Sequence, residues 1–160
     1  IGGNIRKYVA NRANTEAAEA MLIGSLFAGI AFSWARLGNV HAMSHPVSAY
    51  FNVPHGVANA ILLPTIVEYN ALADDGKYRK IYNYVSEIPA AEETFVPSML
   101  TEKLKELNAM LGIPASLREA GVTEETFDAM AEDAMKSGNI LVNPRASKKQ
   151  DILNLYHKAF

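Results

Sequence analysis

The spacing of apolar residues is the feature that most narrows the possible folds of this chain. Apolar and small residues recur every three to four positions, and no segment sustains the two-residue alternation of a half-buried strand. Glycine, proline and capping residues separate these periodic segments. We therefore expect an all-α fold without internal repeats, with helices between Asn14 and Gly38, Gly56 and Asn70, Tyr78 and Val85, Met99 and Leu111, Thr123 and Gly138, and Ser147 and Phe160.

Several helix ends have identifiable signals. Asn14 or Thr15 can cap the first long helix, because a short polar side chain accepts a hydrogen bond from a free backbone N–H. Pro64 should bend or interrupt the helix that contains it. Ser147, followed three positions later by Gln150, forms a capping-box pattern at the start of the last helix.

The longest apolar stretch runs from Leu22 to Trp34 and is interrupted four times by glycine or serine. A bilayer-spanning helix needs about 20 apolar residues, so we interpret this stretch as a buried helix and expect no membrane association. Ile1 is the first residue, and neither a signal peptide nor a transit peptide precedes the first helix. We expect a cytoplasmic protein, and the missing initiator methionine suggests a piece of a longer chain.

Composition excludes several classes of site. The 160 residues include no cysteine, which excludes a disulfide framework, thiolate zinc, an iron–sulfur cluster and a cysteine nucleophile. The net charge of −2 gives no electrostatic reason to bind nucleic acid or an anionic membrane. Any metal ion must therefore be held by histidine and carboxylate side chains.

Three of the four histidines lie within fifteen residues, at His41, His45 and His55. His41 and His45 are four residues apart and would share one helix face. The connection that contains Pro54 can fold the chain back, so that His55 reaches the same face. Spacing alone leaves both a metal site and a surface or core histidine cluster open. His157, near the C-terminus, is expected to be solvated.

The segments around these histidines carry a longer pattern. Residues 38–46 read GNVHAMSHP and residues 52–64 read NVPHGVANAILLP, and they closely resemble the signature of the iron-containing (group III) alcohol dehydrogenases. Ala28–Phe32 and the Asn143-Pro144-Arg145 triplet also resemble this family, so the likeness covers essentially the whole chain. The resemblance implies that residues 1–160 form part of the C-terminal, helical, metal-binding domain of an architecture shared with dehydroquinate synthase.

The resemblance also implies roles for individual residues. His41 and His55 match two of the family's metal ligands, and the ion is Fe2+ or Zn2+. His45 matches a histidine beside the metal that relays the alcohol proton. Phe32 matches an aromatic position lining the substrate and nicotinamide pocket, with a plain core aromatic as the alternative. The implied reaction interconverts a small alcohol and an aldehyde or ketone by hydride transfer with NAD(P).

Two parts of the family's pattern are missing. The remaining ligands come from a D-x-x-x-H stretch that does not occur here, since every aspartate follows the histidine segment. The N-terminal nucleotide-binding domain is absent as well. We therefore expect an inactive fragment of an NAD(P)-linked oxidoreductase, in a parent that forms a homodimer or larger homo-oligomer. The alternatives are a zinc enzyme similar to glycerol dehydrogenase, or a non-enzymatic helical assembly module from a truncated gene.

Overall fold

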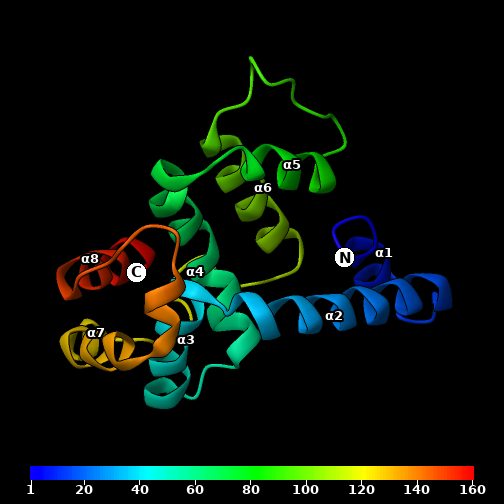
Figure 1. The fold of residues 1–160 in the computed structure, drawn as a ribbon. Helices are drawn as coiled ribbons and strands as arrows, with labels where there is room; N and C mark the ends of the chain where they lie inside the picture. The colour runs from blue at the N-terminus through cyan, green and yellow to red at the C-terminus, as the bar shows by residue number, and fades with distance from the viewer.

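The computed structural model describes residues 1–160 and confirms the all-α expectation, because no residue lies in a strand. Most elements follow one another with short connections, and longer loops join α5 to α6 and follow α6 (Figure 1). They are α1 (Ile5–Ala10), α2 (Thr15–Ala35), α3 (Gly38–Phe51), α4 (His55–Asn70), η1 (Ala71–Ala73), α5 (Lys77–Val85), α6 (Pro97–Met110), η2 (Glu124–Thr126), α7 (Phe127–Lys136), η3 (Gly138–Val142) and α8 (Lys149–Ala159).

The core lies between α3, α4, α7 and α8 and is built from fully buried apolar side chains. Tyr156 of α8 stacks on Phe127 of α7, with ring centroids 5.6 Å apart. The Tyr156 hydroxyl donates a hydrogen bond of 2.7 Å to the backbone carbonyl of Met43 in α3. This bond gives a fully buried hydroxyl of the core a partner, as burial requires.

Helix α4 continues through Pro64, so of the expected bend or interruption the interruption does not occur. A proline ring removes one backbone N–H, and here that leaves the carbonyl of Ala60 without its helical donor. Asn108 of α6 replaces the missing donor, because its side-chain amide donates to the Ala60 oxygen at 2.7 Å. A neighbouring helix thus supplies the hydrogen bond that lets α4 remain one element.

Asn143 joins three segments that are distant in sequence. Its side-chain oxygen accepts from the backbone N–H of Asn39, at the start of α3, and from the amide of Asn70, at the end of α4. Its amide nitrogen donates to Asn70 and to the carbonyl of Arg145. Gly38 has φ +67°, and a side chain there would meet the Asn143 oxygen at 3.1 Å. We call this set of buried amides the Asn143 clamp.

Two predicted helix caps had different outcomes. The side chain of Asn14 accepts from the backbone N–H of Ala17, which confirms the cap of α2. The capping box at Ser147 is wrong, because α8 begins at Lys149 and the carboxylate of Asp151 accepts from the Lys148 N–H. The Ser147 hydroxyl instead accepts from the side chain of Asn39 at 2.7 Å, so a long-range contact replaces the local cap.

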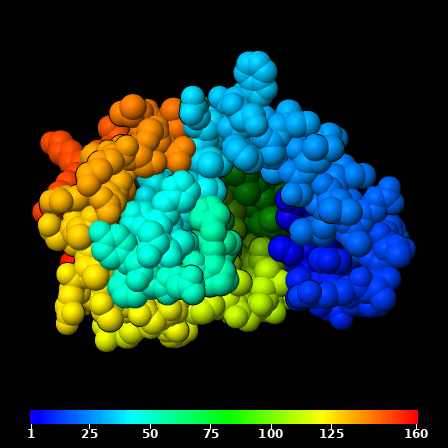
Figure 2. All heavy atoms as spheres, turned by 90° about the horizontal axis from the view of Figure 1, so that it is seen from below, coloured from blue at the N-terminus to red at the C-terminus, as the bar shows by residue number.

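The prediction that the apolar stretch in α2 is buried is wrong within these 160 residues, since only Ala17 of this helix is buried. Figure 2 shows the N-terminal helices to one side of the bundle, with a hollow between them and the rest. By length and composition alone, α2 with its 21 residues could cross a membrane, a test that the core helix of a soluble protein also passes. Its large side chains are solvent-exposed, with relative areas of 73% for Leu22, 61% for Leu26, 64% for Phe27 and 88% for Trp34.

Candidate metal centre

The histidine cluster is positioned by the tight reversal between α3 and α4. Asn52 ends α3 in the left-handed region, with φ 54°, a conformation that asparagine adopts more readily than most residues. Val53 is buried and Pro54, with φ −54°, starts α4. Because the two helices then pack side by side, His55 in the first turn of α4 returns to the face that carries His41 and His45.

The three histidine rings lie together, as the sequence predicted. The ring centroids of His41 and His55 are 5.1 Å apart, those of His45 and His55 are 5.2 Å apart, and those of His41 and His45 are 6.2 Å apart. His41 is partly buried, whereas His45 and His55 are exposed. The cluster therefore opens to solvent on one side and rests on the α3–α4 pair on the other.

Sequence reasoning missed one residue at this centre, Asn59. Its side-chain nitrogen lies 3.2 Å from Nε2 of His41 and 3.0 Å from Nε2 of His55. Asn59 follows His55 by four residues, so both side chains project from the same face of α4. That spacing was the available signal, but an asparagine in a run of small and apolar residues is easily taken for a surface residue.

Burial and neighbouring imidazoles lower the pKa of two of the three histidines, His41 and His45. Partial burial lowers the pKa of His41, and the neighbouring His55 and His45 lower it further. Burial also lowers the pKa of His45, with a smaller contribution from His55. A neutral imidazole has a nitrogen lone pair available, which is the state that binds divalent metals.

The cluster fits two of the ligands of a divalent metal centre. Nε2 of His41 and Nε2 of His55 point toward one place, where the Asn59 amide now lies between them. Nδ1 of His41 is buried without a hydrogen-bond partner, so this ring is held in position by its Nε2 side alone. No set of three histidine, aspartate or glutamate side chains is arranged to hold an ion. The cluster therefore offers two converging ring nitrogens, fewer donors than the four that a zinc site usually has.

The other two singled-out residues lie apart from the cluster. Phe32 is 47% exposed on α2, so it is not a core aromatic within these residues, and its ring makes no contact with the three histidines. Its assignment to a nicotinamide pocket stays a prediction. His157 is half-exposed as expected, with its ring against Phe127 and 3.7 Å from the carboxylate of Glu124.

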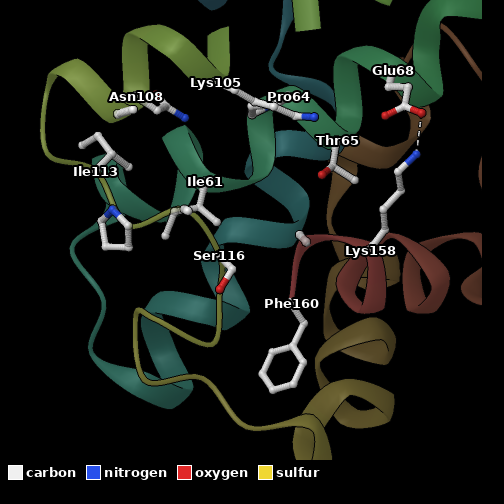
Figure 3. Close-up of a pocket in the computed structure, with 14 residues that line it drawn as sticks. Ile61, Pro64, Thr65, Glu68, Lys105, Asn108, Ile113, Ser116, Lys158 and Phe160 are labelled. Atoms are coloured by element: carbon white, nitrogen blue, oxygen red, sulfur yellow. Dashed lines mark hydrogen bonds and ion pairs between the residues drawn. The ribbon is translucent and has the colours of Figure 1, made fainter. Parts of the chain in front are cut away.

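A cavity of about 390 Å³ lies between α4, α6, the loop after α6 and the end of α8 (Figure 3). Ile61, Pro64 and Thr65 line it from α4, and an ion pair of 2.6 Å between Glu68 and Lys158 lies at its edge. At about 100° per residue, Pro64 and Ile61 project about 180° and 120° away from His55, so the cavity and the histidines lie on different faces of α4. The cavity is therefore no part of the candidate metal centre.

Comparison with known proteins gives one consistent family. The sequence model described as Fe-containing alcohol dehydrogenase family, C-terminal, matches residues 1–160. The 1,3-propanediol dehydrogenase of Citrobacter freundii is 40% identical over 161 residues, and lactaldehyde reductase of Escherichia coli K12 is 39% identical over 161 residues. Each alignment covers 100% of this chain and 42% of the relative.

A solved structure shares the fold as well as the sequence. The alcohol dehydrogenase from Oenococcus oeni superposes with a TM-score of 0.92 at 34% identity, over 99% of this chain and 42% of the other. The chain thus spans less than half the length of the proteins it matches. Because the expected N-terminal nucleotide-binding domain has a parallel sheet and these residues form no strand, that domain is not within residues 1–160.

Proposed function

Because this chain belongs to the Fe-containing alcohol dehydrogenase family, we propose that it supplies the C-terminal half of the metal centre of an NAD(P)-linked oxidoreductase. The reaction interconverts a small alcohol and an aldehyde or ketone. The observation that carries the proposal is the convergence of Nε2 of His41 and Nε2 of His55 on one point, with the pKa of His41 lowered by burial.

His41 and His55 are the residues that would hold Fe2+ or Zn2+. When bound, such an ion acts as a Lewis acid toward the oxygen of the alcohol or carbonyl group. Neutral imidazole suits either ion, so the ligand pair does not distinguish them. An aspartate and a further histidine, from a D-x-x-x-H stretch outside these residues, complete the coordination.

His45 is assigned to proton transfer rather than to metal binding. Its ring lies 5.2 Å from that of His55, is exposed to solvent and makes no hydrogen bond to Asn59. An imidazole in this place can pass a proton between the reacting oxygen and water, because its two ring nitrogens can accept and donate in turn. Phe32 is assigned to the apolar wall beside the nicotinamide.

A chimera tests the proposal directly. This chain replaces the matching 42% of C. freundii 1,3-propanediol dehydrogenase. We expect the chimera to hold about one iron or zinc per chain by elemental analysis and to oxidise 1,3-propanediol with NAD or NADP, whereas the 160-residue chain alone is inactive.

Point variants of the chimera separate the roles. His55→Ala should remove the metal, and His157→Ala, which changes a histidine far from the cluster, should retain it. His45→Ala should keep the metal and lower kcat roughly 100-fold or more, the usual contribution of a positioned acid–base group. A folded chimera that binds no metal contradicts the proposal and favours the helical assembly module.

A further inference from the structure

We infer that Tyr156 is a positioning residue for the histidine cluster: from α8, its hydroxyl holds the turn of α3 that carries His41 and His45. The hydroxyl donates to the backbone carbonyl of Met43 at 2.7 Å, although the two residues are 113 positions apart in the sequence. Met43 lies two residues after His41 and two before His45. The inference rests on the proposed function only for the use of His41 as a metal ligand.

The turn of α3 that carries the two histidines lacks one of its own hydrogen bonds. Pro46 lies inside α3 and has no backbone N–H, so the carbonyl of Ala42 loses its helical donor. The Tyr156 hydroxyl bonds to the next carbonyl along the chain, that of Met43. A residue from another helix therefore ties down the turn that Pro46 leaves less constrained.

The packing of the Tyr156 ring fixes where its hydroxyl lies. Tyr156 is fully buried, and its ring stacks on Phe127 of α7 with centroids 5.6 Å apart and planes at 25°. Burial raises the pKa of Tyr156, so the hydroxyl keeps its proton and remains a donor. A phenylalanine would fill the same space, so the bond to Met43 is what the hydroxyl adds.

The C-terminal part of the chain also holds α3 two residues before His41. The backbone N–H of Asn39 donates to Oδ1 of Asn143 at 3.1 Å, and the side-chain amide of Asn39 donates to the Ser147 hydroxyl at 2.7 Å. His41 therefore lies midway between two positions of α3, Asn39 and Met43, that residues near the C-terminus hold by hydrogen bonds.

The ring of His41 depends on this backbone for its position. A metal-binding histidine usually makes a hydrogen bond through the ring nitrogen that does not face the metal, and that bond orients the ring. Nδ1 of His41 is buried and has no such partner. The ring centroid of His41 nevertheless lies 5.1 Å from that of His55 on α4. A shift of the turn around Met43 should therefore change the distance between these two rings.

NMR of the 160-residue chain tests the inference without added metal. Tyr156→Phe removes the hydroxyl and keeps the ring. We expect amide hydrogen exchange in residues 41–47 to become roughly 2- to 10-fold faster, the factor for the loss of one hydrogen bond, while the other core helices change less. We also expect weaker nuclear Overhauser effects between the ring protons of His41 and His55.

Two control variants make the result specific. Ile152→Val makes a buried side chain of α8 smaller and lowers stability without removing the bond to Met43. Tyr50→Phe removes a different hydroxyl bond of α3, the one to Asp133 at 2.9 Å, near the C-terminal end of that helix. Neither control should weaken the Overhauser effects between the histidine rings or speed up exchange selectively in residues 41–47.

Urea denaturation of each variant shows whether a local effect exceeds a general loss of stability. If Tyr156→Phe speeds up exchange equally in all core helices, as a purely structural tyrosine would, the inference is wrong. It is also wrong if the Overhauser effects between the rings of His41 and His55 keep their wild-type strength.

Zinc binding by the 1,3-propanediol dehydrogenase chimera separates this inference from the proposed function. Changing a residue that orients a metal ligand typically weakens metal binding about 10- to 100-fold. We expect Tyr156→Phe to raise the Kd for Zn2+ roughly 10-fold, at the lower end of that range, and Tyr50→Phe to leave it unchanged. An unchanged Kd with Tyr156→Phe contradicts the inference. A chimera that binds no zinc before any substitution contradicts the proposed function, and the NMR results on the 160-residue chain then decide the inference alone.

Discussion

At the scale of single residues, the histidine cluster combines contacts set by local spacing with contacts set by the packing of α3 on α4. His41, His45 and His55 meet because helical spacing and a short reversal are local properties that a sequence pattern expresses. The hydrogen bonds of Asn59 depend on the separation of α3 and α4, which is set by packing. Reasoning from one segment at a time therefore could not find them.

Arg36, between α2 and α3, is a strained residue. Its backbone has φ 63° and ψ −168°, a region adopted almost only by glycine, and its exposed side chain makes no hydrogen bond or ion pair. Such a conformation costs about 1–3 kcal/mol. We expect Arg36→Gly to raise the free energy of unfolding by about 1 kcal/mol in urea denaturation, after the entropy cost of glycine is subtracted.

Asn52→Gly is the control for this prediction. Asn52 also has a positive φ, 54°, but in the left-handed helical region that asparagine tolerates. Its substitution should change stability by only a few tenths of a kcal/mol, because asparagine already adopts this conformation at little cost. Equal effects at both positions would show that glycine entropy, and not strain at Arg36, governs the result.

Tyr78 in α5 gives the chain a sensitivity to alkaline pH. Burial, followed by the nearby charge of Asp74, raises the pKa of Tyr78 to about 12 from its ordinary value of 10. The folded state therefore holds this proton more tightly than the unfolded state, so the contribution is complete below pH 10 and is lost as the pH rises toward 12. Tyr78→Phe should make the melting temperature fall less steeply between pH 9.5 and 11.5 than it does in the wild type. An equal fall of the melting temperature in both proteins contradicts this.

At the scale of elements, most helices were predictable and their interactions were not. The apolar periodicity located α2 and α4 to α8 within a few residues, because periodicity reports which face of a helix is buried. The false cap at Ser147 and the uninterrupted α4 share one cause. In both cases a side chain distant in sequence forms the decisive hydrogen bond. Asn39 donates to the Ser147 hydroxyl, which was expected to cap α8, and Asn108 donates to the carbonyl that Pro64 leaves without a helical donor.

The link between Pro64 and Asn108 can be measured as a double-mutant cycle. Asn108→Ala leaves the Ala60 carbonyl without a donor and should cost about 1–2 kcal/mol in urea denaturation. In a Pro64→Ala background the new backbone N–H at position 64 can bond to that carbonyl, so the same substitution should cost about 1 kcal/mol less. Additive effects of the two substitutions would show that Asn108 does not replace the missing donor.

At the scale of the whole molecule, the sequence identified the family and the absence of a sheet, and it misjudged α2. A helix that is apolar on most faces is ordinarily buried. Here Leu22, Leu26 and Ile30, spaced four residues apart, remain exposed because nothing within 160 residues packs on them. Burial depends on what surrounds a helix, and a chain that spans 42% of its relatives' length carries only part of those surroundings.

The exposed stripe on α2 should make this chain associate. Contiguous apolar surface binds the dye ANS and other copies of the same surface. We expect Leu22→Gln, Leu26→Gln and Ile30→Gln together to reduce ANS fluorescence and to shift the chain toward a monomer in light scattering. The control changes Leu72 and Leu141 to glutamine, since these residues are more exposed but lie outside the α2 stripe, and it should leave both measurements unchanged.

The Asn143 clamp has a consequence for how the chain is made. The backbone N–H of Asn39 donates to the side chain of Asn143, which lies 104 residues later in the chain. At about 5–20 residues per second, the ribosome adds Asn143 roughly 5 to 20 s after Asn39. During that interval the backbone N–H of Asn39 and the side-chain amide of Asn70 lack their hydrogen-bond partner, because Asn143 has not yet been synthesised. Until then these amides form hydrogen bonds to water. A nascent chain arrested before residue 143 should therefore contain the histidine segment without the hydrogen bonds that join the start of α3 to the end of α4.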